Sequence, residues 1–221
     1  MKLFTRPGAS SLSVHILLRE IGEPFQLEAV NVTTTLRADG SDYRAAAPHG
    51  MVPLLVLDDG EELTENLVIA QYLCDRARRY DLMPATGTQR RYRVMEWQSF
   101  VAAELDKNFM ALTRRLEGPV RELALLRIHE RLAVAERELT GPYLTGFSFT
   151  AADAFFFVIA SRARHYRIPL HAYPRIEALL DLIGERASVR DALAAEGLSR
   201  GHWLAEENPQ AVADAPAAFA R

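Results

Sequence analysis

The pattern of apolar residues changes near residue 80, and this change constrains the fold of the 221-residue chain more than any other feature. Before it, short β-like runs alternate with segments of helical periodicity, in the order β-α-β, a connecting segment and β-β-α. From about residue 87 the periodicity is helical throughout. This order fits a mixed sheet of three or four strands with helices on it, followed by an all-helical part.

The expected elements follow from the period of the apolar residues and from the turn signals between them. Strands are predicted at residues 2–5, 25–30, 54–57 and 62–63, the last after a tight Asp58-Asp59-Gly60 turn. Helices are predicted from residue 12 and at 65–77, 89–116, 122–139, 152–166, 176–186 and 189–195. These elements divide the chain into an α/β domain at 1–80, a linker at 81–87, an all-helical domain at 88–206 and a loose tail at 207–221.

Composition excludes several classes of function. The net charge is −3 and no block of Lys or Arg stands out, which argues against nucleic-acid binding. No apolar run reaches the roughly 18 residues needed to cross a membrane, and none resembles a signal peptide. The single cysteine, Cys74, excludes an internal disulfide, and no His or Cys spacing indicates a metal site. A cytoplasmic protein without membrane, metal or nucleic-acid partners is therefore expected.

Two serines, Ser10 and Ser11, stand at the junction between the first strand and the first helix. Pro7 and Gly8 end the strand, and the helical spacing begins directly after the serines. A helix N-terminus presents unpaired N–H groups and a partial positive charge. A hydroxyl at this point can either cap its own helix or donate a hydrogen bond to an anion, such as a thiolate, bound above the helix.

A second group of polar positions surrounds the third and fourth strands. Val52-Pro53 stands just before a strand, and a cis bond there would expose the Val52 backbone to an extended peptide ligand. Glu65 and Asn66 follow the fourth strand and open a helix. Either Thr64 or Asn66 could cap this helix, and its N–H groups suit a carboxylate. Glu65 could pair with a ligand ammonium group or stabilise its own helix.

The chain resembles the cytosolic glutathione S-transferases, and most closely their bacterial beta class. The resemblance is carried by KLFTRPGASSLSVHILLREIG, by PHGMVPLLVLDDGEELTEN with VIAQYL after it, and by EWQSFVAAELDKNF and GPYLTGFSFTAADAFFF. It implies a thioredoxin-like domain followed by a helical bundle, usually as a homodimer. It also implies glutathione as co-substrate and a role in detoxification.

The resemblance assigns glutathione contacts residue by residue. The glutathione backbone pairs with the residue before the cis-proline, which matches Val52 and Pro53, and its γ-glutamyl end meets Glu65 and Asn66. Asparagine replaces the usual serine at the last of these positions. Ser99 and Glu104 complete the implied glutathione site on the helical domain.

Several ligand-facing positions depart from the beta-class pattern. Ser10 stands where the class usually has a cysteine, Thr5 where it has a tyrosine, Thr35 where it has a lysine and Asp106 where it has a histidine. Ser99 stands where an asparagine is common. A serine cannot form a mixed disulfide with glutathione, but its hydroxyl can donate to a bound thiolate.

A pocket for the second substrate is expected between the domains. Its candidate residues, taken from family position and helical spacing, are Asp106, Phe109, Met110, Thr113 and Tyr166. Asp106 could raise the thiol pKa, bind a cationic group, act as a base, or only pair with Lys107 or Arg114. An aromatic and Met stripe of this kind is more often part of the core than of a pocket.

Two functions fit the sequence. The first is an enzyme that activates the glutathione thiolate, through Ser10 or Ser11, for attack on a small apolar electrophile. The alternative is a non-catalytic protein of the same fold that binds apolar ligands or a protein partner. The segment Thr150-Ala-Ala-Asp153 is independent of this choice, because it reads as a capping box that starts a buried helix.

Overall fold

The computed structural model describes residues 1–37 and 39–198, and the predicted tail at 207–221 lies outside this range. Four strands form one sheet in the order β2-β1-β3-β4, with β1 and β2 parallel and the other pairs antiparallel. The strands are β1 (Lys2–Thr5), β2 (Gln26–Ala29), β3 (Leu54–Val56) and β4 (Glu62–Thr64). Each predicted strand is therefore confirmed, with β2 and β3 shorter than expected.

The helices of the first part are α1 (Ser11–Ile21) and α2 (Asn66–Arg76), with a short 3-10 turn, η1 (Tyr43–Ala45), between β2 and β3. Both helices lie on one face of the sheet, where Leu3 and Leu55 pack against Val14 and Ile69. On the opposite face, Phe4 and Leu54 alternate with these strand residues and pack against the segment around Tyr43. The predicted mixed sheet with helices on it is confirmed.

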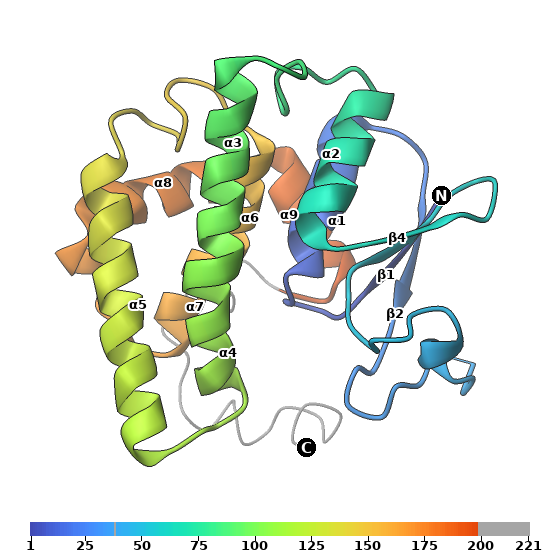
Figure 1. The fold of residues 1–221 in the computed structure, drawn as a ribbon, viewed down its shortest axis with the longest axis horizontal. Coiled ribbons are helices and arrows are strands. Elements are labelled where there is room, and N and C mark those ends of the chain that lie inside the picture. The colour runs from blue at the N-terminus through green and yellow to red at the C-terminus, as the bar shows by residue number, and fades with distance from the viewer. Residues whose placement is uncertain (38, 199–221) are drawn as a thin grey trace.

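The second part is helical (Figure 1). Its elements are α3 (Gln89–Phe100), η2 (Val101–Asp106), α4 (Lys107–Thr113), α5 (Gly118–Glu138), α6 (Ala151–Ala160), α7 (Arg162–His165), η3 (Leu170–Ala172), α8 (Pro174–Gly184) and α9 (Ala187–Ala195). The α6 helix is buried along its whole length, as its apolar sequence predicts. The capping box of Thr150 and Asp153 at its start is also confirmed.

The predicted helix at 89–116 contains a π-helical segment, η2, at its centre. This wider turn inserts an extra residue into the helix and changes which side chains share a face after it. Another difference is α5, which begins at Gly118 rather than at 122, because Pro119 occupies the first turn. The predicted helix at 152–166 is divided at Ser161 into α6 and α7.

One hydrophobic core joins the two parts of the chain. Leu12, Ile16 and Leu17 of α1 pack into the same cluster as the residues of α6. The α1 helix also packs against α9, which brings the end of the described chain next to the Ser10 loop (Figure 1). No helix within the described residues is long and apolar enough to cross a membrane.

Candidate functional site

The loop between β1 and α1 places Ser10 at the N-terminus of α1. Gly8 takes a positive φ of 71°, which a glycine tolerates without strain, and the Ala9 amide donates to the Arg6 carbonyl at 3.0 Å. Ser10 is the N-cap residue, but its side chain makes no capping hydrogen bond. Its carbonyl accepts hydrogen bonds from the Ser13 amide at 3.1 Å and from the Ser13 hydroxyl at 2.8 Å. The Ser10 hydroxyl is therefore not used to close its own helix.

Ser11 differs from Ser10 in both burial and bonding. Its side chain is fully buried, and its hydroxyl oxygen lies 2.8 Å from the Thr5 hydroxyl. It also accepts a hydrogen bond from the Arg6 amide at 3.3 Å. The Ser11 hydroxyl is held inside the protein, between β1 and α1, whereas Ser10 is half-buried at the helix end.

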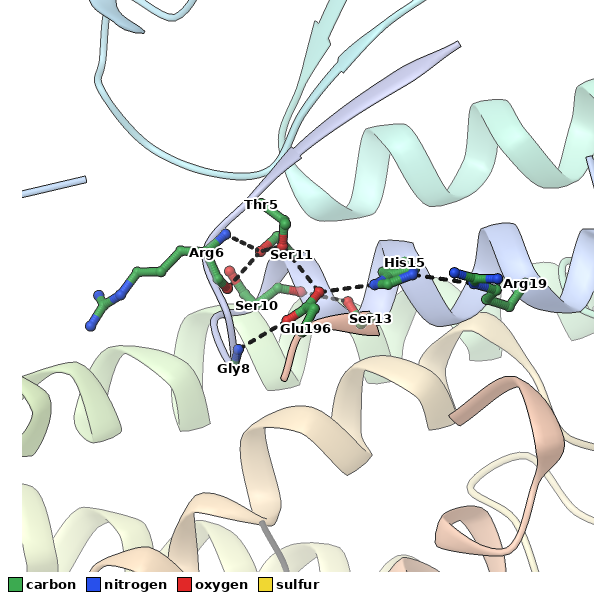
Figure 2. A network of polar contacts seen from close by, with 9 residues as sticks. All are labelled: Thr5, Arg6, Gly8, Ser10, Ser11, Ser13, His15, Arg19 and Glu196. Atoms are coloured by element: carbon green, nitrogen blue, oxygen red, sulfur yellow. Dashed lines mark hydrogen bonds and ion pairs between the residues drawn. The ribbon is translucent and has the colours of Figure 1, made fainter. Parts of the chain in front are cut away.

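Glu196, just after α9, binds the same loop from the other end of the chain (Figure 2). Its carboxylate accepts hydrogen bonds from the Gly8 amide at 3.0 Å, the Thr5 hydroxyl at 3.2 Å and Nδ1 of His15 at 3.0 Å. Nε of Arg19 donates to Nε2 of His15 at 3.3 Å, so this imidazole is neutral with its proton on Nδ1. The loop that carries Ser10 is thus fixed by a buried carboxylate.

The sequence did not reveal this network. Glu196 is 181 residues from His15, and no motif links them. Only the amphipathic pattern of α9 signals that this segment packs against the protein. His15 is completely buried. Thr5, which replaces the tyrosine of the beta class, is buried and joins Ser11 to Glu196.

The polar positions of β3, β4 and α2 lie on the sheet side of the site. The Val52–Pro53 bond is cis, and Pro53 is buried beside the half-buried Val52. Glu65 is exposed, with a positive φ of 69°, at the start of α2. Neither Thr64 nor Asn66 is the N-cap of α2, so this part of the expectation is wrong: Glu65 holds that position without a side-chain cap.

Asn66 turns toward the Ser10 loop. Its side-chain nitrogen donates to the Ser10 carbonyl and to the Ser13 hydroxyl, both at 2.8 Å. The residue is 7% exposed, and its Oδ1 atom is buried with no partner in the described part of the chain. The Asn66 side chain therefore contacts the Ser10 loop from the protein interior and not from the solvent-exposed side.

The expected second-substrate residues gather where η2 and α4 meet α7. The rings of Phe109 and Tyr166 stack with their centroids 6.1 Å apart, and the Tyr166 hydroxyl lies 2.9 Å from the Thr113 hydroxyl. Asp106 pairs with Nη1 of Arg162 at 2.5 Å, not with Lys107 or Arg114. Met110 is half-buried on the same helix.

Two arginines, Arg6 and Arg162, bring positive charge close to Asp106 and Tyr166. The pKa of the Arg6 guanidinium is lowered, first by burial and then by the nearby Arg162 charge. Figure 2 shows the Arg6 side chain pointing away from the Glu196 network. The negative charge of Asp106 is balanced by the guanidinium of Arg162.

Two candidates lie apart from this group. Ser99 is exposed on α3, and the carboxylate of Glu104 lies 2.8 Å from Nε of Arg131 on α5.

Cys74 is buried, and burial raises the pKa of its thiol to about 12, so it is not a nucleophile at neutral pH. Within residues 1–37 and 39–198, no group of His, Cys, Asp or Glu is arranged to hold a metal ion.

Comparison with known proteins identifies the family. Residues 9–76 match the family model described as the glutathione S-transferase N-terminal domain. The chain is 38% identical over 201 residues to glutathione S-transferase GstA of Escherichia coli O157:H7, which covers 90% of this chain and 100% of that protein.

Solved structures agree with the sequence match. A beta-class glutathione S-transferase of Sphingomonas chungbukensis superposes with a TM-score of 0.85 at 38% identity, covering 90% of this chain and 100% of that one. A sphingomonad glutathione S-transferase complexed with glutathione gives a TM-score of 0.83 at 35% identity, with the same coverage. The expected fold is thus confirmed, and the chain belongs to the glutathione S-transferase family.

Proposed function

We propose that the protein is a glutathione transferase in which the Ser10 hydroxyl holds the glutathione thiolate for attack on a small apolar electrophile. The observation that carries this proposal is the difference between the two serines. Ser10 stands at the N-terminus of α1 without a capping hydrogen bond, whereas the Ser11 hydroxyl is buried against Thr5. Ser10 is therefore the serine that can donate to a ligand.

The energetics of this role are within reach of one hydroxyl and one helix end. A free thiol has a pKa of roughly 8.5, and lowering it by about two units requires about 2.7 kcal/mol of preference for the anion. A hydrogen bond to a charged group contributes roughly 1.5–3 kcal/mol, and the helix terminus adds to it. The thiolate then attacks the electrophile, and the leaving group departs with its electron pair.

The rest of glutathione is assigned to the sheet side of the site. A relative 35% identical to this chain has been solved in complex with glutathione, which supports the proposal that this protein also binds the tripeptide. We assign its backbone to Val52 beside Pro53 and its ammonium group to the exposed Glu65. Ser99 is a peripheral contact in this proposal. Glu104 is a weaker one, because its carboxylate faces Arg131.

The electrophile is assigned to the group formed by Asp106, Phe109, Met110, Thr113 and Tyr166. Phe109 is fully buried behind the partly exposed Tyr166, so the Tyr166 ring supplies the apolar surface, and the Thr113 and Tyr166 hydroxyls offer polar contacts at its edge. A homodimer and a cytoplasmic location complete the proposal, as expected for this family.

Turnover of a generic aryl halide with glutathione tests the proposal, together with retention on immobilised glutathione. Ser10→Ala should lower kcat by roughly 10- to 1,000-fold, which is the cost of removing a comparable preorganised donor. Ser11→Ala should act mainly on stability. Retention without turnover would favour the non-catalytic alternative, and loss of both would reject glutathione as the ligand. If Ser11→Ala alone abolished turnover, the donor role would move to Ser11.

A further inference from the structure

The Asn66 side chain lies in a fixed orientation at the start of α2. Both hydrogens of its amide are used, one on the Ser10 carbonyl and one on the Ser13 hydroxyl oxygen, each at 2.8 Å. The Ser13 hydroxyl in turn donates to the Ser10 carbonyl at 2.8 Å. A flipped amide would set Oδ1 against the Ser10 carbonyl, with two acceptors in contact, so the geometry allows only the observed orientation.

These contacts form a closed triangle around the Ser10 carbonyl. The Ser10 carbonyl accepts from three donors, and two of them, the Ser13 amide and the Ser13 hydroxyl, belong to α1 itself. The third, Asn66, comes from a different element 56 residues later in the chain. The triangle therefore fixes the backbone of Ser10, and with it the direction of its Cα–Cβ bond, relative to the N-terminus of α2.

The same geometry leaves the Asn66 side chain little capacity to bind glutathione. The residue is 7% exposed and its amide hydrogens are occupied. Its remaining polar atom, Oδ1, is buried and is an acceptor, so it would repel a ligand carboxylate. The contact expected from the family resemblance, with the γ-glutamyl end of glutathione, does not suit this side chain.

We propose that Asn66 is a positioning residue, which holds the Ser10 carbonyl so that the Ser10 hydroxyl faces the glutathione sulfur. This inference rests on the proposed function of Ser10. It assigns Asn66 a role in kcat and in thiolate stabilisation rather than in glutathione affinity. A donor misplaced by about 1 Å loses on the order of 100-fold in rate, so a modest shift of the loop is enough to be measured.

The test replaces Asn66 by leucine, which keeps the approximate volume, adds no charge and removes both donors. The thiol of bound glutathione is titrated by the ultraviolet absorbance of its thiolate, and kcat and KM for glutathione are measured alongside. Asn66→Leu should raise the apparent thiol pKa and lower kcat by about 10- to 100-fold, with KM nearly unchanged. Asn108→Leu is the matched control, because Asn108 also donates its amide to a backbone carbonyl, that of Glu104. It should leave the thiol pKa unchanged.

A second background shows whether Asn66 acts through Ser10. In the Ser10→Ala protein, Asn66→Leu should cause no further change in the thiol pKa, because the group that it positions is absent. An equal change in both backgrounds would overturn the inference. So would a raised KM with kcat and thiol pKa unchanged, because that pattern is typical of a ligand contact.

Failure of the variant to fold and failure of the protein to bind glutathione can each be distinguished from failure of the positioning role. If Asn66→Leu does not fold, Asn66→Ala provides the same test, because it also removes both amide donors and adds neither charge nor bulk. An unchanged thiol pKa in that variant would contradict the positioning role. Absence of glutathione binding by the unaltered protein would instead reject the proposed function, and it is measured before any Asn66 variant.

Discussion

The Glu196 carboxylate accepts a hydrogen bond from the Gly8 amide at 3.0 Å, two residues before Ser10. This contact joins the end of α9 to the loop that begins α1. Because the same carboxylate also accepts from Thr5 and His15, one side chain fixes the end of β1, the loop and the body of α1 together. The helical part of the chain thus determines the shape of the loop that carries the proposed thiolate donor.

Replacing Glu196 should therefore affect stability and catalysis together. Glu196→Ala removes the acceptor of the Gly8 amide and of Nδ1 of His15 and should lower the free energy of unfolding by about 2–4 kcal/mol. Urea unfolding measures this change. The isosteric Glu196→Gln variant keeps an acceptor and should lose less. A free energy of unfolding unchanged in Glu196→Ala would show that the network does not hold the loop.

Asp153 should give the protein a pH-dependent stability unrelated to the site. Burial raises the pKa of Asp153 to about 6, although hydrogen bonds from the Leu144 and Thr150 amides and from the Thr150 hydroxyl oppose this effect. The pKa is thus higher in the folded than in the unfolded protein. Its contribution to stability is therefore fully present below a pH of about 4 and is lost as the pH rises through about 6.

The measurement is the free energy of unfolding of the wild type minus that of Asp153→Asn, at the two ends of this window. The difference should fall from low to neutral pH by on the order of 3 kcal/mol. Subtraction of the variant removes the contributions of other carboxylates, such as Glu28, whose pKa is lowered by its hydrogen bond from Arg37. A difference that does not change with pH would contradict the raised pKa of Asp153.

The Asp106–Arg162 pair offers a test of how the second-substrate region is held together. Its side chains are 18% and 14% exposed and 2.5 Å apart, so a double-mutant cycle of Asp106→Asn and Arg162→Gln should give a coupling of about 1 kcal/mol in stability. A coupling near zero would show that the pair does not hold this region together and that Asp106 is available to bind a cationic group of the substrate. Asp106→Asn would then raise KM for cationic electrophiles alone.

The fold was largely predictable from sequence because its signals are local. The strands and α6 show their burial in the period and composition of a few neighbouring residues, and the Thr150–Asp153 cap spans one helical turn. The π segment η2 was not predictable, because a single extra residue in a helix leaves the apolar pattern almost unchanged.

The position of the candidate site was predictable from sequence, but its hydrogen-bond network was not. The motif around Ser10 and Ser11 identifies the helix end, yet the choice between the serines depends on Thr5 and Glu196, which are brought to Ser11 by the tertiary fold. The same holds for Asn66, whose inward direction depends on the distance between α2 and the Ser10 loop rather than on its neighbours in sequence.

The most direct test of the account is the pKa of the glutathione thiol bound to the wild type and to Ser10→Ala, followed by the ultraviolet absorbance of the thiolate. A hydrogen bond from Ser10 should hold this pKa below the roughly 8.5 of a free thiol, and its removal should raise the pKa by about one to two units. The same lowered pKa in both proteins would show that Ser10 does not stabilise the thiolate, and would contradict the central claim.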